Sequence, residues 1–284
     1  MQRPMTTAVL LGFSVLIAAC CPATSSASDA CFEGDPVSGL FDDIEVIENA
    51  GYTVGFSPET LTPIWACYTF AKVDEPPKLS RPKKNFNMHV SGEAVVRHKD
   101  YTNSGYDRGH LAPSSGIGKN FGKDAQIGTF KCSNICPQHP GLNQRCWERF
   151  EKQVAGFYAD RFEKVWVVTG PIYEDNCIEL LSGVRVPEAF FKVIVAEIDG
   201  KVEMLGVIMP NERTEKSPIS FFVHSVDEIE ALAGIDLFSE LEDPVEDAAE
   251  AKNPPHWQWS TGWELRPVFS GTERTIRVQE CDEP

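Results

Sequence analysis

The chain has 284 residues, a formal net charge of −16 and 42% hydrophobic residues. This length provides a core for one large domain or two small ones, and the lack of internal repeats excludes a repeat architecture. The acidic total excludes a surface that attracts polyanions everywhere. Residues 80–164, however, carry 14 Lys and Arg against 8 Asp and Glu, so the composition is compatible with a local phosphate site.

The N-terminus carries a predicted export signal over residues 1–20. Its apolar run, residues 8–19, matches the ~7–15 residues of a signal-peptide core and is too short to span a membrane. The end of the run resembles a bacterial lipobox in which Cys20 would be lipidated, and the alternative is ordinary cleavage near Ala27. We therefore expect an exported protein, periplasmic or extracellular, with a lipid anchor at Cys20 as one form.

Export favours disulfide bonds among the cysteines of the mature chain. An extended segment from Cys132 to Cys136 would place their Cα atoms about 13 Å apart, beyond the ~7 Å limit for a disulfide. These two cysteines are therefore predicted to pair elsewhere, if they pair. A zinc site at Cys132, Cys136 and Cys146 is an alternative, although the three lack a paired short-spacing ligand set. The candidates for disulfides are Cys31, Cys67, Cys132, Cys136, Cys146, Cys177 and Cys281.

The part of the chain after residue 50 is predicted to hold the folded domain. We interpret residues 21–50 as a tether and acidic lead-in, and residues 51–242 as one domain. Runs of β-branched and aromatic residues between Gly and Pro predict strands at 52–56 and 64–71. Residues 90–98 fit either a strand or the edge of a loop.

The middle of the chain contains the clearest helix. Residues 114–123 are rich in glycine and lysine and are predicted to be a loop, and residues 128–136 to be a strand. A helix is predicted to begin near Leu142, because apolar residues then recur at steps of three and four and form one stripe. The stripe consists of Trp147, Phe150, Val154, Phe157 and Tyr158.

The C-terminal part mixes strands with one short helix. Ser225, with an acid three residues later, predicts the N-cap of a helix that ends at Ala233. Residues 243–284 form an acidic extension whose role is not readable from the sequence. Because strands and helices mix without a regular βαβ pattern, the sequence predicts an α+β fold. Further strands are predicted at 165–169, 190–198 and 204–209.

Three residue types suited to phosphate chemistry lie at informative positions. His110, in the motif that runs from Asp107 to Pro113, offers a base, because an unperturbed imidazole has a pKa of about 6.5. Asn143, at the start of the predicted helix, offers the hard oxygen that Mg²⁺ prefers. Glu151 follows about two helical turns later and borders the same side. A base, an amide oxygen and a carboxylate would thus meet one hydrated metal ion and one phosphate.

Several ordered motifs carry a resemblance to a known family. They lie at residues 106–113, 133–138, 142–151, 167–173, 186–193 and 207–211. Together they are similar to the DNA/RNA non-specific endonuclease family, the ββα-metal or His-Me finger nucleases. The likeness covers residues 52–240.

The resemblance implies a central antiparallel sheet flanked by helices, with a ββα-metal finger, and DNA and RNA as substrates of hydrolysis with little sequence specificity. It implies that His110 is the general base and that Asn143 is the direct ligand of Mg²⁺, with Mn²⁺ as the alternative ion. Glu151 would reach the ion through water. Asn134 would support the active site, and Arg108 would lie beside the base.

The chain also departs from the family pattern. Family members commonly place an arginine one turn after the glutamate, where this chain has Ala155. An upstream phosphate-binding arginine has only ambiguous counterparts in Arg81, Lys84 and Arg97. Two other functions therefore stay open: a catalytically weak nucleic-acid-binding surface protein, and an exported nuclease toxin.

Overall fold

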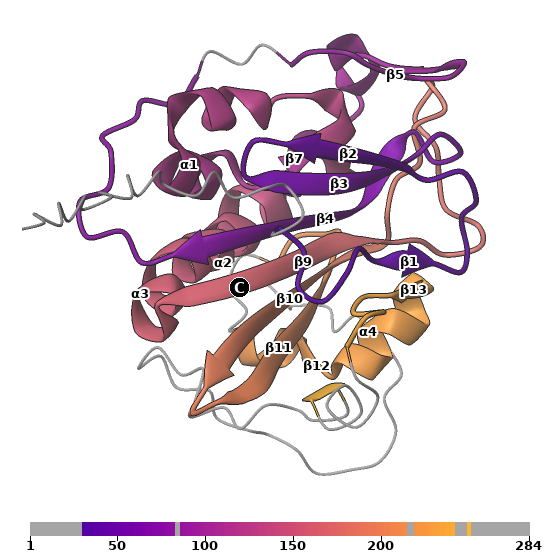
Figure 1. Ribbon diagram of the computed structural model, residues 1–284. Helices are drawn as coiled ribbons and strands as arrows, with labels where there is room; N and C mark the ends of the chain where they lie inside the picture. Colours follow the sequence, from indigo (N-terminus) through magenta and orange to yellow (C-terminus); the bar gives the residue numbers. More distant parts are fainter. Residues whose placement is uncertain (1–29, 83–85, 215–218, 242–248, 251–284) are drawn as a thin grey trace, which may run out of the picture.

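Seven antiparallel strands form the central sheet of the computed structural model, which describes residues 30–82, 86–214, 219–241 and 249–250 (Figure 1). The strand order is β12-β11-β10-β9-β4-β3-β2. This sheet with helices packed on it confirms the α+β class and the antiparallel sheet that the resemblance implies. The strands are β2 (Glu45–Asn49), β3 (Tyr52–Ser57), β4 (Thr62–Ala71), β9 (Lys164–Ile172), β10 (Ala189–Ile198), β11 (Lys201–Pro210) and β12 (Val223–His224).

The two faces of the sheet carry separate hydrophobic clusters, because side chains alternate along each strand. On β10, Phe190 and Ile194 belong to one cluster, whereas Phe191 and Val193 belong to the other. Lys192 stands between Phe190 and Ile194 in this alternation and has no exposed surface. A lysine side chain is therefore buried on the same face as Phe190.

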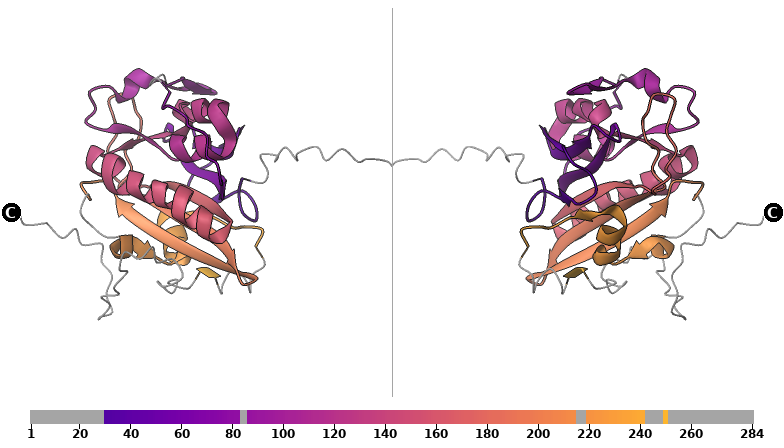
Figure 2. Two further views of the ribbon diagram at one scale, coloured as in Figure 1. Left: turned by 90° about the vertical axis from the view of Figure 1, so that its left-hand side faces the viewer. Right: turned by 90° about the vertical axis from the view of Figure 1, so that its right-hand side faces the viewer.

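One long helix, residues 142–162, covers this face (Figure 2). The structure confirms the helix predicted from near Leu142 and buries its stripe, except that Phe157 is 37% exposed. Two segments are π-helical, a local widening that is frequent at functional sites. The successive segments are η4 (Leu142–Trp147), α2 (Glu148–Gln153), η5 (Val154–Tyr158) and α3 (Ala159–Phe162).

A shorter helix, α4 (Val226–Ala233), packs on the opposite face, where its Val226 and Ile229 join the second cluster. It begins as predicted, because the Ser225 side chain accepts a hydrogen bond from the Glu228 backbone N–H at 3.2 Å. It ends before Gly234, which takes the left-handed conformation.

The loop prediction for residues 114–123 is wrong, because this segment belongs to helix α1 (Ser114–Gly128). Gly116 lets α1 approach β4 closely: a Cβ atom there would lie 2.3 Å from Cζ of Phe70. Gly122 has a φ of 87° and kinks the helix. Tertiary packing on Phe70 thus outweighs the low helix propensity of glycine.

A two-stranded ribbon precedes the long helix. It pairs β7 (Asp107–His110) with β8 (Ile135–Gln138), and His110 stands opposite Ile135. The strand predicted at 128–136 is therefore largely wrong, since η3 (Cys132–Asn134) turns the chain before β8 begins. We call β7, β8 and the long helix the finger.

The remaining elements are short. The undecided segment around residue 90 forms a hairpin, and part of the predicted lead-in joins the fold, because β2 lies at the edge of the sheet. Residues 1–29 and, apart from 249–250, residues 243–284 lie outside the described chain. The short elements are β1 (Val37–Ser38), β5 (His89–Ser91), β6 (Ala94–Val96), η2 (His98–Tyr101), η6 (Ile219–Phe222) and β13 (Ile235–Asp236).

A disulfide between Cys31 and Cys67 ties the N-terminal segment to β4, with a Cα–Cα distance of 4.9 Å. Cys132 and Cys136 do not pair with each other, as predicted, although η3 makes their segment turn where an extended chain was expected. Both are free thiols, so their place among the disulfide candidates is wrong. Within the described chain these two thiols and Cys146 do not converge as a metal-binding group. In the same part of the chain, no helix has the length and apolarity to cross a bilayer.

Candidate active site

His110 ends β7 with its imidazole among aromatic rings. Its ring centroid lies 4.9 Å from that of Phe130 and 5.6 Å from that of Phe86. Burial and the nearby Arg81 lower the pKa of His110 to about 3, against a hydrogen bond to the Arg108 backbone. The Nε2 atom is shielded from solvent and has no partner among the described residues, so Nδ1 makes that backbone bond. Neutral His110 therefore presents Nε2 as a proton acceptor.

The side chain of Asp107 holds the start of the long helix. Its Oδ2 atom accepts hydrogen bonds from Nδ2 of Asn143 at 2.8 Å and from Nε2 of Gln144 at 2.7 Å. With Nδ2 engaged, the carbonyl Oδ1 of Asn143 is the atom left for a cation. Asp107 thus orients the expected metal ligand, a role that the sequence motif contains but that sequence reasoning missed.

Glu151 lies in α2 with its Oε1 atom shielded from solvent and without a partner among the described residues. Burial raises the pKa of Glu151 to about 7, and Glu148 adds to the rise. Lys192, the indole of Trp147 and Lys152 act in the opposite direction. The carboxylate is thus poised to gain or lose a proton near neutral pH, and a cation beside it would favour the ionised form.

Lys192 is a second functional candidate that sequence reasoning missed. Its Nζ atom donates a hydrogen bond to the Tyr68 hydroxyl at 2.9 Å and lies 4.6 Å from the ring centroid of Trp147. Burial lowers the pKa of Lys192 to about 8, while the charge of Glu151 raises it. The signal in the sequence is a single lysine in the otherwise apolar run at residues 189–196, since a buried charge persists only when it is paired.

Asn134 is fully used in holding the chain around His110. Its Oδ1 atom accepts the backbone N–H of Ala112 at 2.9 Å, and its Nδ2 atom donates to the carbonyls of Ala112 and Thr129. It has no exposed surface. This geometry fits a positioning residue and not one that touches a substrate.

Arg108 is also held by the protein. Its Nη2 atom donates to the carbonyl oxygen of His98 at 2.7 Å and to Oγ1 of Thr102 at 2.9 Å. Its guanidinium lies 5.8 Å from the ring centroid of Phe86, the same ring that contacts His110. Arg108 therefore lies beside the base, with part of its hydrogen-bonding capacity already used.

The structure also bears on the two uncertain arginine positions. Arg81 acts electrostatically on His110, which favours it as the upstream phosphate-binding residue, whereas Lys84 lies outside the described chain. Ala155 is only 8% exposed and packs in the core. Its carbonyl oxygen accepts a hydrogen bond from Lys119 Nζ at 2.8 Å. An arginine at position 155 would have to displace this packing.

The donors present fit a hard divalent cation. His110 Nε2 and Glu151 Oε1 are shielded polar atoms without partners among the described residues, so each is available to a ligand or a water molecule. The amide oxygen of Asn143 and a carboxylate are ligand types that suit Mg²⁺, which keeps much of its water.

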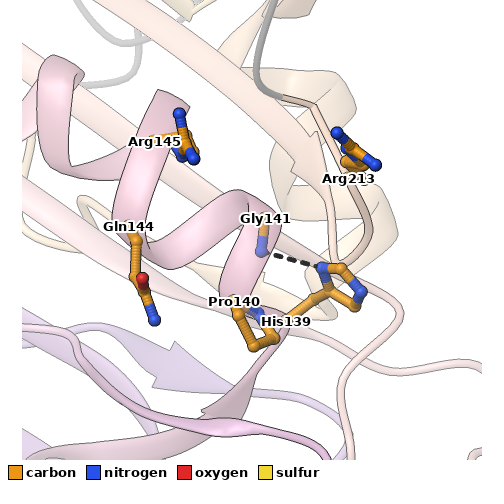
Figure 3. Close-up of a pocket in the computed structure, with 6 residues that line it drawn as sticks. All are labelled: His139, Pro140, Gly141, Gln144, Arg145 and Arg213. Atoms are coloured by element: carbon orange, nitrogen blue, oxygen red, sulfur yellow. Dashed lines mark hydrogen bonds between the residues drawn. The ribbon is translucent and has the colours of Figure 1, made fainter.

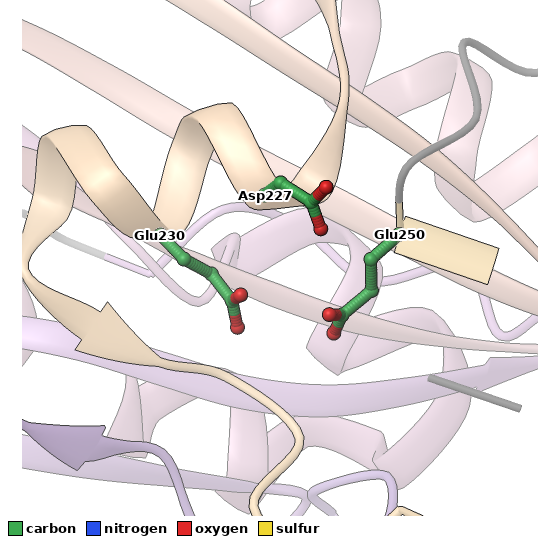
Figure 4. Close-up of side chains that lie close together, drawn as sticks. All are labelled: Asp227, Glu230 and Glu250. Atoms are coloured by element: carbon green, nitrogen blue, oxygen red, sulfur yellow. The ribbon is translucent and has the colours of Figure 1, made fainter. Parts of the chain in front are cut away.

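A second group of carboxylates, two on α4 and one from the separate segment 249–250, lies away from the finger. Asp227, Glu230 and Glu250 bring ligand atoms within 4.8 Å of one another (Figure 4). One Glu230 oxygen accepts the backbone N–H of Leu237 at 2.7 Å, which joins α4 to the segment after it. We assign no metal to this group, because clustered acidic side chains are common without one.

Comparison with known proteins identifies the family. Residues 35–244, well over half of the chain, match the DNA/RNA non-specific endonuclease family. The chain belongs to this family. Its fold is similar to that of a solved structure of EndoG in complex with EndoGI, with a TM-score of 0.65, 27% identity, and coverage of 78% of this chain and 96% of that chain.

Curated relatives include endonuclease G from Bos taurus, which is 29% identical over 201 residues and shares 66% of each chain's length. Nuclease 1 of Schizosaccharomyces pombe is 27% identical over 216 residues, which cover 68% of this chain and 66% of that protein. The chain thus spans about two-thirds of the length of these relatives.

The prediction of an exported, periplasmic or extracellular protein is wrong, because these relatives and the similar nuclease of Saccharomyces cerevisiae are mitochondrial. That prediction rested on the short apolar run at residues 8–19. Hydrophobicity and length alone do not define a destination, since targeting segments for different compartments share an N-terminal position. The run and Cys20 both lie outside the described chain.

Proposed function

We propose that this chain is a Mg²⁺-dependent endonuclease that hydrolyses phosphodiester bonds in DNA and RNA with little sequence specificity. The main support is the shielded Nε2 atom of His110, neutral and without a partner among the described residues, on the finger that also carries Asn143 and Glu151. Leaving such an atom unpaired costs about 1–3 kcal/mol. A site built for a reacting water explains why the cost is tolerated.

In this proposal His110 Nε2 removes a proton from the water that attacks phosphorus, and the bond from phosphorus to the leaving oxygen breaks. Asn143 Oδ1 would hold Mg²⁺ directly, and Glu151 would hold water molecules of its hydration shell. When bound, the ion supplies Lewis-acid polarisation of the phosphate and stabilises the leaving oxygen.

Charged side chains near His110 would bind the substrate backbone. Arg81 is exposed and close enough to affect the His110 pKa, so we assign it to the scissile phosphate. Arg108 would add a second contact at lower strength, because His98 and Thr102 already hold it. Contacts to phosphate read no bases, in keeping with low sequence specificity.

Oligonucleotide digestion tests the proposed function. End-labelled DNA and RNA of the same sequence are incubated with the protein in Mg²⁺ or in chelator. We expect fragment ladders with breaks at many positions in both the DNA and the RNA, and only when Mg²⁺ is present. Binding without fragmentation would instead support the catalytically weak nucleic-acid-binding alternative, and neither binding nor cleavage would reject both functions.

Replacing Asn143 with alanine is expected to raise the Mg²⁺ concentration for half-maximal cleavage by on the order of tenfold or more, because losing even a residue that only supports a ligand typically costs 10–100-fold in metal affinity. Asp107→Ala should act in the same direction, since Asp107 holds the Asn143 amide at 2.8 Å. A Mg²⁺ titration of cleavage measures both. Midpoints unchanged in both variants would remove Asn143 from the metal site.

Mg²⁺ binding is expected to release a proton from Glu151 below about pH 7, where this buried carboxyl is largely protonated. A cation cannot share the site with that proton, so Mg²⁺ affinity should fall as the pH is lowered. Calorimetric titration in buffers of different ionisation enthalpy, at about pH 6 and about pH 8, counts the protons released.

The matched control is Glu151→Gln, which keeps the shape of the side chain but cannot ionise. Its Mg²⁺ binding should release no proton at either pH. Equal proton release by this variant and the parent would show that another group titrates.

A further inference from the structure

A shallow hollow of about 280 Å³ adjoins the beginning of the long helix (Figure 3). Figure 3 shows Arg145 projecting from the helix and Arg213 from the facing loop after β11, with Gly141 and His139 between them. The complete lining consists of His139, Pro140, Gly141, Gln144, Arg145 and Arg213.

The backbone on both sides of the hollow is fixed by close contacts. A Cβ atom at Gly141 would lie 3.0 Å from Cα of Arg213, so the glycine allows the facing loop to approach the helix. Asn211 Oδ1 accepts the backbone N–H of His139 at 2.7 Å, and its Nδ2 atom donates to the Pro187 carbonyl at 2.8 Å. The two arginines therefore extend from anchored positions.

The chemistry of the lining suits an anion. Arg145 and Arg213 are exposed, and a guanidinium offers a planar fork of donors that matches two phosphate oxygens. His139 Nδ1 accepts the backbone N–H of Gly141 at 3.0 Å, so the neutral imidazole carries its proton on Nε2 and adds a donor. The partial positive charge of the helix N-terminus favours the same occupant.

The hollow adjoins the candidate metal site. Gln144 lines the hollow and donates a hydrogen bond to Asp107 Oδ2, the atom that also holds Asn143. A nucleic-acid strand whose scissile phosphate lies at Asn143 would therefore carry a neighbouring phosphate past Arg145 and Arg213.

We infer that this hollow binds a phosphate that flanks the scissile one on the same nucleic-acid strand. The inference rests on the proposed function. It supplies two strand-positioning arginines in a chain whose position 155 holds a buried alanine. Because the contacts are to phosphate, they strengthen binding to every sequence and make it depend on salt.

The test measures binding of a fluorescent single-stranded DNA oligonucleotide in chelator, so that cleavage does not occur, over a series of salt concentrations. The variant Arg145→Gln/Arg213→Gln is expected to lower the slope of log affinity against log salt by about 0.7, because each phosphate that the protein neutralises on a single strand adds this amount to the slope. Arg145→Lys/Arg213→Lys should retain most of the slope, because it keeps both charges. Thermal melting should change little, since interactions of exposed charged side chains contribute little to stability.

The matched control is Lys164→Gln/Lys201→Gln, which also removes two positive charges. These lysines are the first residues of β9 and β11, whereas Arg213 follows the last residue of β11. Its slope should equal that of the parent. A salt slope for Arg145→Gln/Arg213→Gln that equals the slope of this control overturns the inference. Saturable binding of inorganic phosphate alone, with the DNA slope unchanged, would also overturn it and assign the hollow to free phosphate.

Failure of the inference is distinguishable from failure of the proposed function. A parent protein that cleaves DNA in Mg²⁺, with variants of unchanged salt slope, rejects only the phosphate hollow. A parent protein that neither binds nor cleaves DNA rejects both.

Discussion

Replacing His110 with alanine is expected to lower the rate of DNA cleavage by about 10² to 10⁴, the usual contribution of a general base. Binding of the oligonucleotide should change little, because Nε2 acts on water and not on the ground-state phosphate. Single-turnover cleavage in saturating Mg²⁺ measures the rate, and anisotropy in chelator measures the binding.

The control is His98→Ala, which removes the imidazole stacked on Phe86 at a centroid distance of 5.5 Å. We expect its rate to stay near that of the parent. A large loss of rate in His98→Ala, with near-normal cleavage by His110→Ala, would show that His110 is not the base.

The pH profile distinguishes His110 from Glu151. The pKa of His110 is lowered to about 3, so this base stays neutral throughout the neutral range. Loss of cleavage on acidification should instead follow Glu151, whose pKa is raised to about 7 and is lowered again when a cation binds. Raising the Mg²⁺ concentration should therefore move the acidic limb to lower pH, and a limb that does not respond to Mg²⁺ would contradict this assignment.

Replacing Lys192 with methionine is expected to destabilise the fold by roughly 3–5 kcal/mol above neutral pH, the usual cost of removing one partner from a buried charge pair. Methionine fills a similar volume, but it leaves Glu151 without its counter-charge and the Tyr68 hydroxyl without its donor. Urea unfolding measures the change.

The sign of the pH dependence follows from the raised pKa of Glu151. A group whose folded pKa lies above its unfolded value stabilises the fold at low pH, and this contribution is lost as the pH rises through the folded pKa. The destabilisation by Lys192→Met should thus shrink below about pH 7, where Glu151 is protonated.

The double variant Lys192→Met/Glu151→Gln isolates the pair. It removes both charges, so it should recover most of the stability while metal use stays impaired. If it is as unstable as Lys192→Met alone, the destabilisation comes from packing against Trp147 and not from the charge of Glu151.

Periodicity predicted the parts of the fold whose pattern reports directly on burial. The long helix follows from apolar residues at steps of three and four, and α4 follows from the Ser225 cap. Strands β4, β9, β10 and β11 were predicted from their apolar runs. These elements form the two clusters on either side of the sheet.

Helix α1 could not be predicted, because its glycine content argues against a helix and the packing that requires Gly116 involves a residue distant in sequence. Gly116 faces Phe70, and only the folded packing shows that a larger residue would collide there. In the same way, the spacing of Cys132 and Cys136 does not predict the 3₁₀ turn η3, which begins at Cys132 and turns the chain before Cys136.

The motif predicted which residue types meet at the finger but not how they are held. The place of Asp107 as the support of Asn143 depends on the angle between β7 and the long helix, which spacing does not give. The role of Lys192 required the register of β10 beneath Trp147. The helix pattern also did not show that Ala155 packs in the core, with its carbonyl oxygen held by Lys119 on α1.

Cleavage of covalently closed plasmid DNA tests the central claim most directly, because only an internal break can relax a closed circle. The parent protein and His110→Ala are each incubated with plasmid in Mg²⁺ and in chelator. The account predicts nicked and then fragmented plasmid for the parent in Mg²⁺ alone, with His110→Ala slower by at least about 10². An intact circle in every reaction, or equal cleavage in chelator, would contradict it.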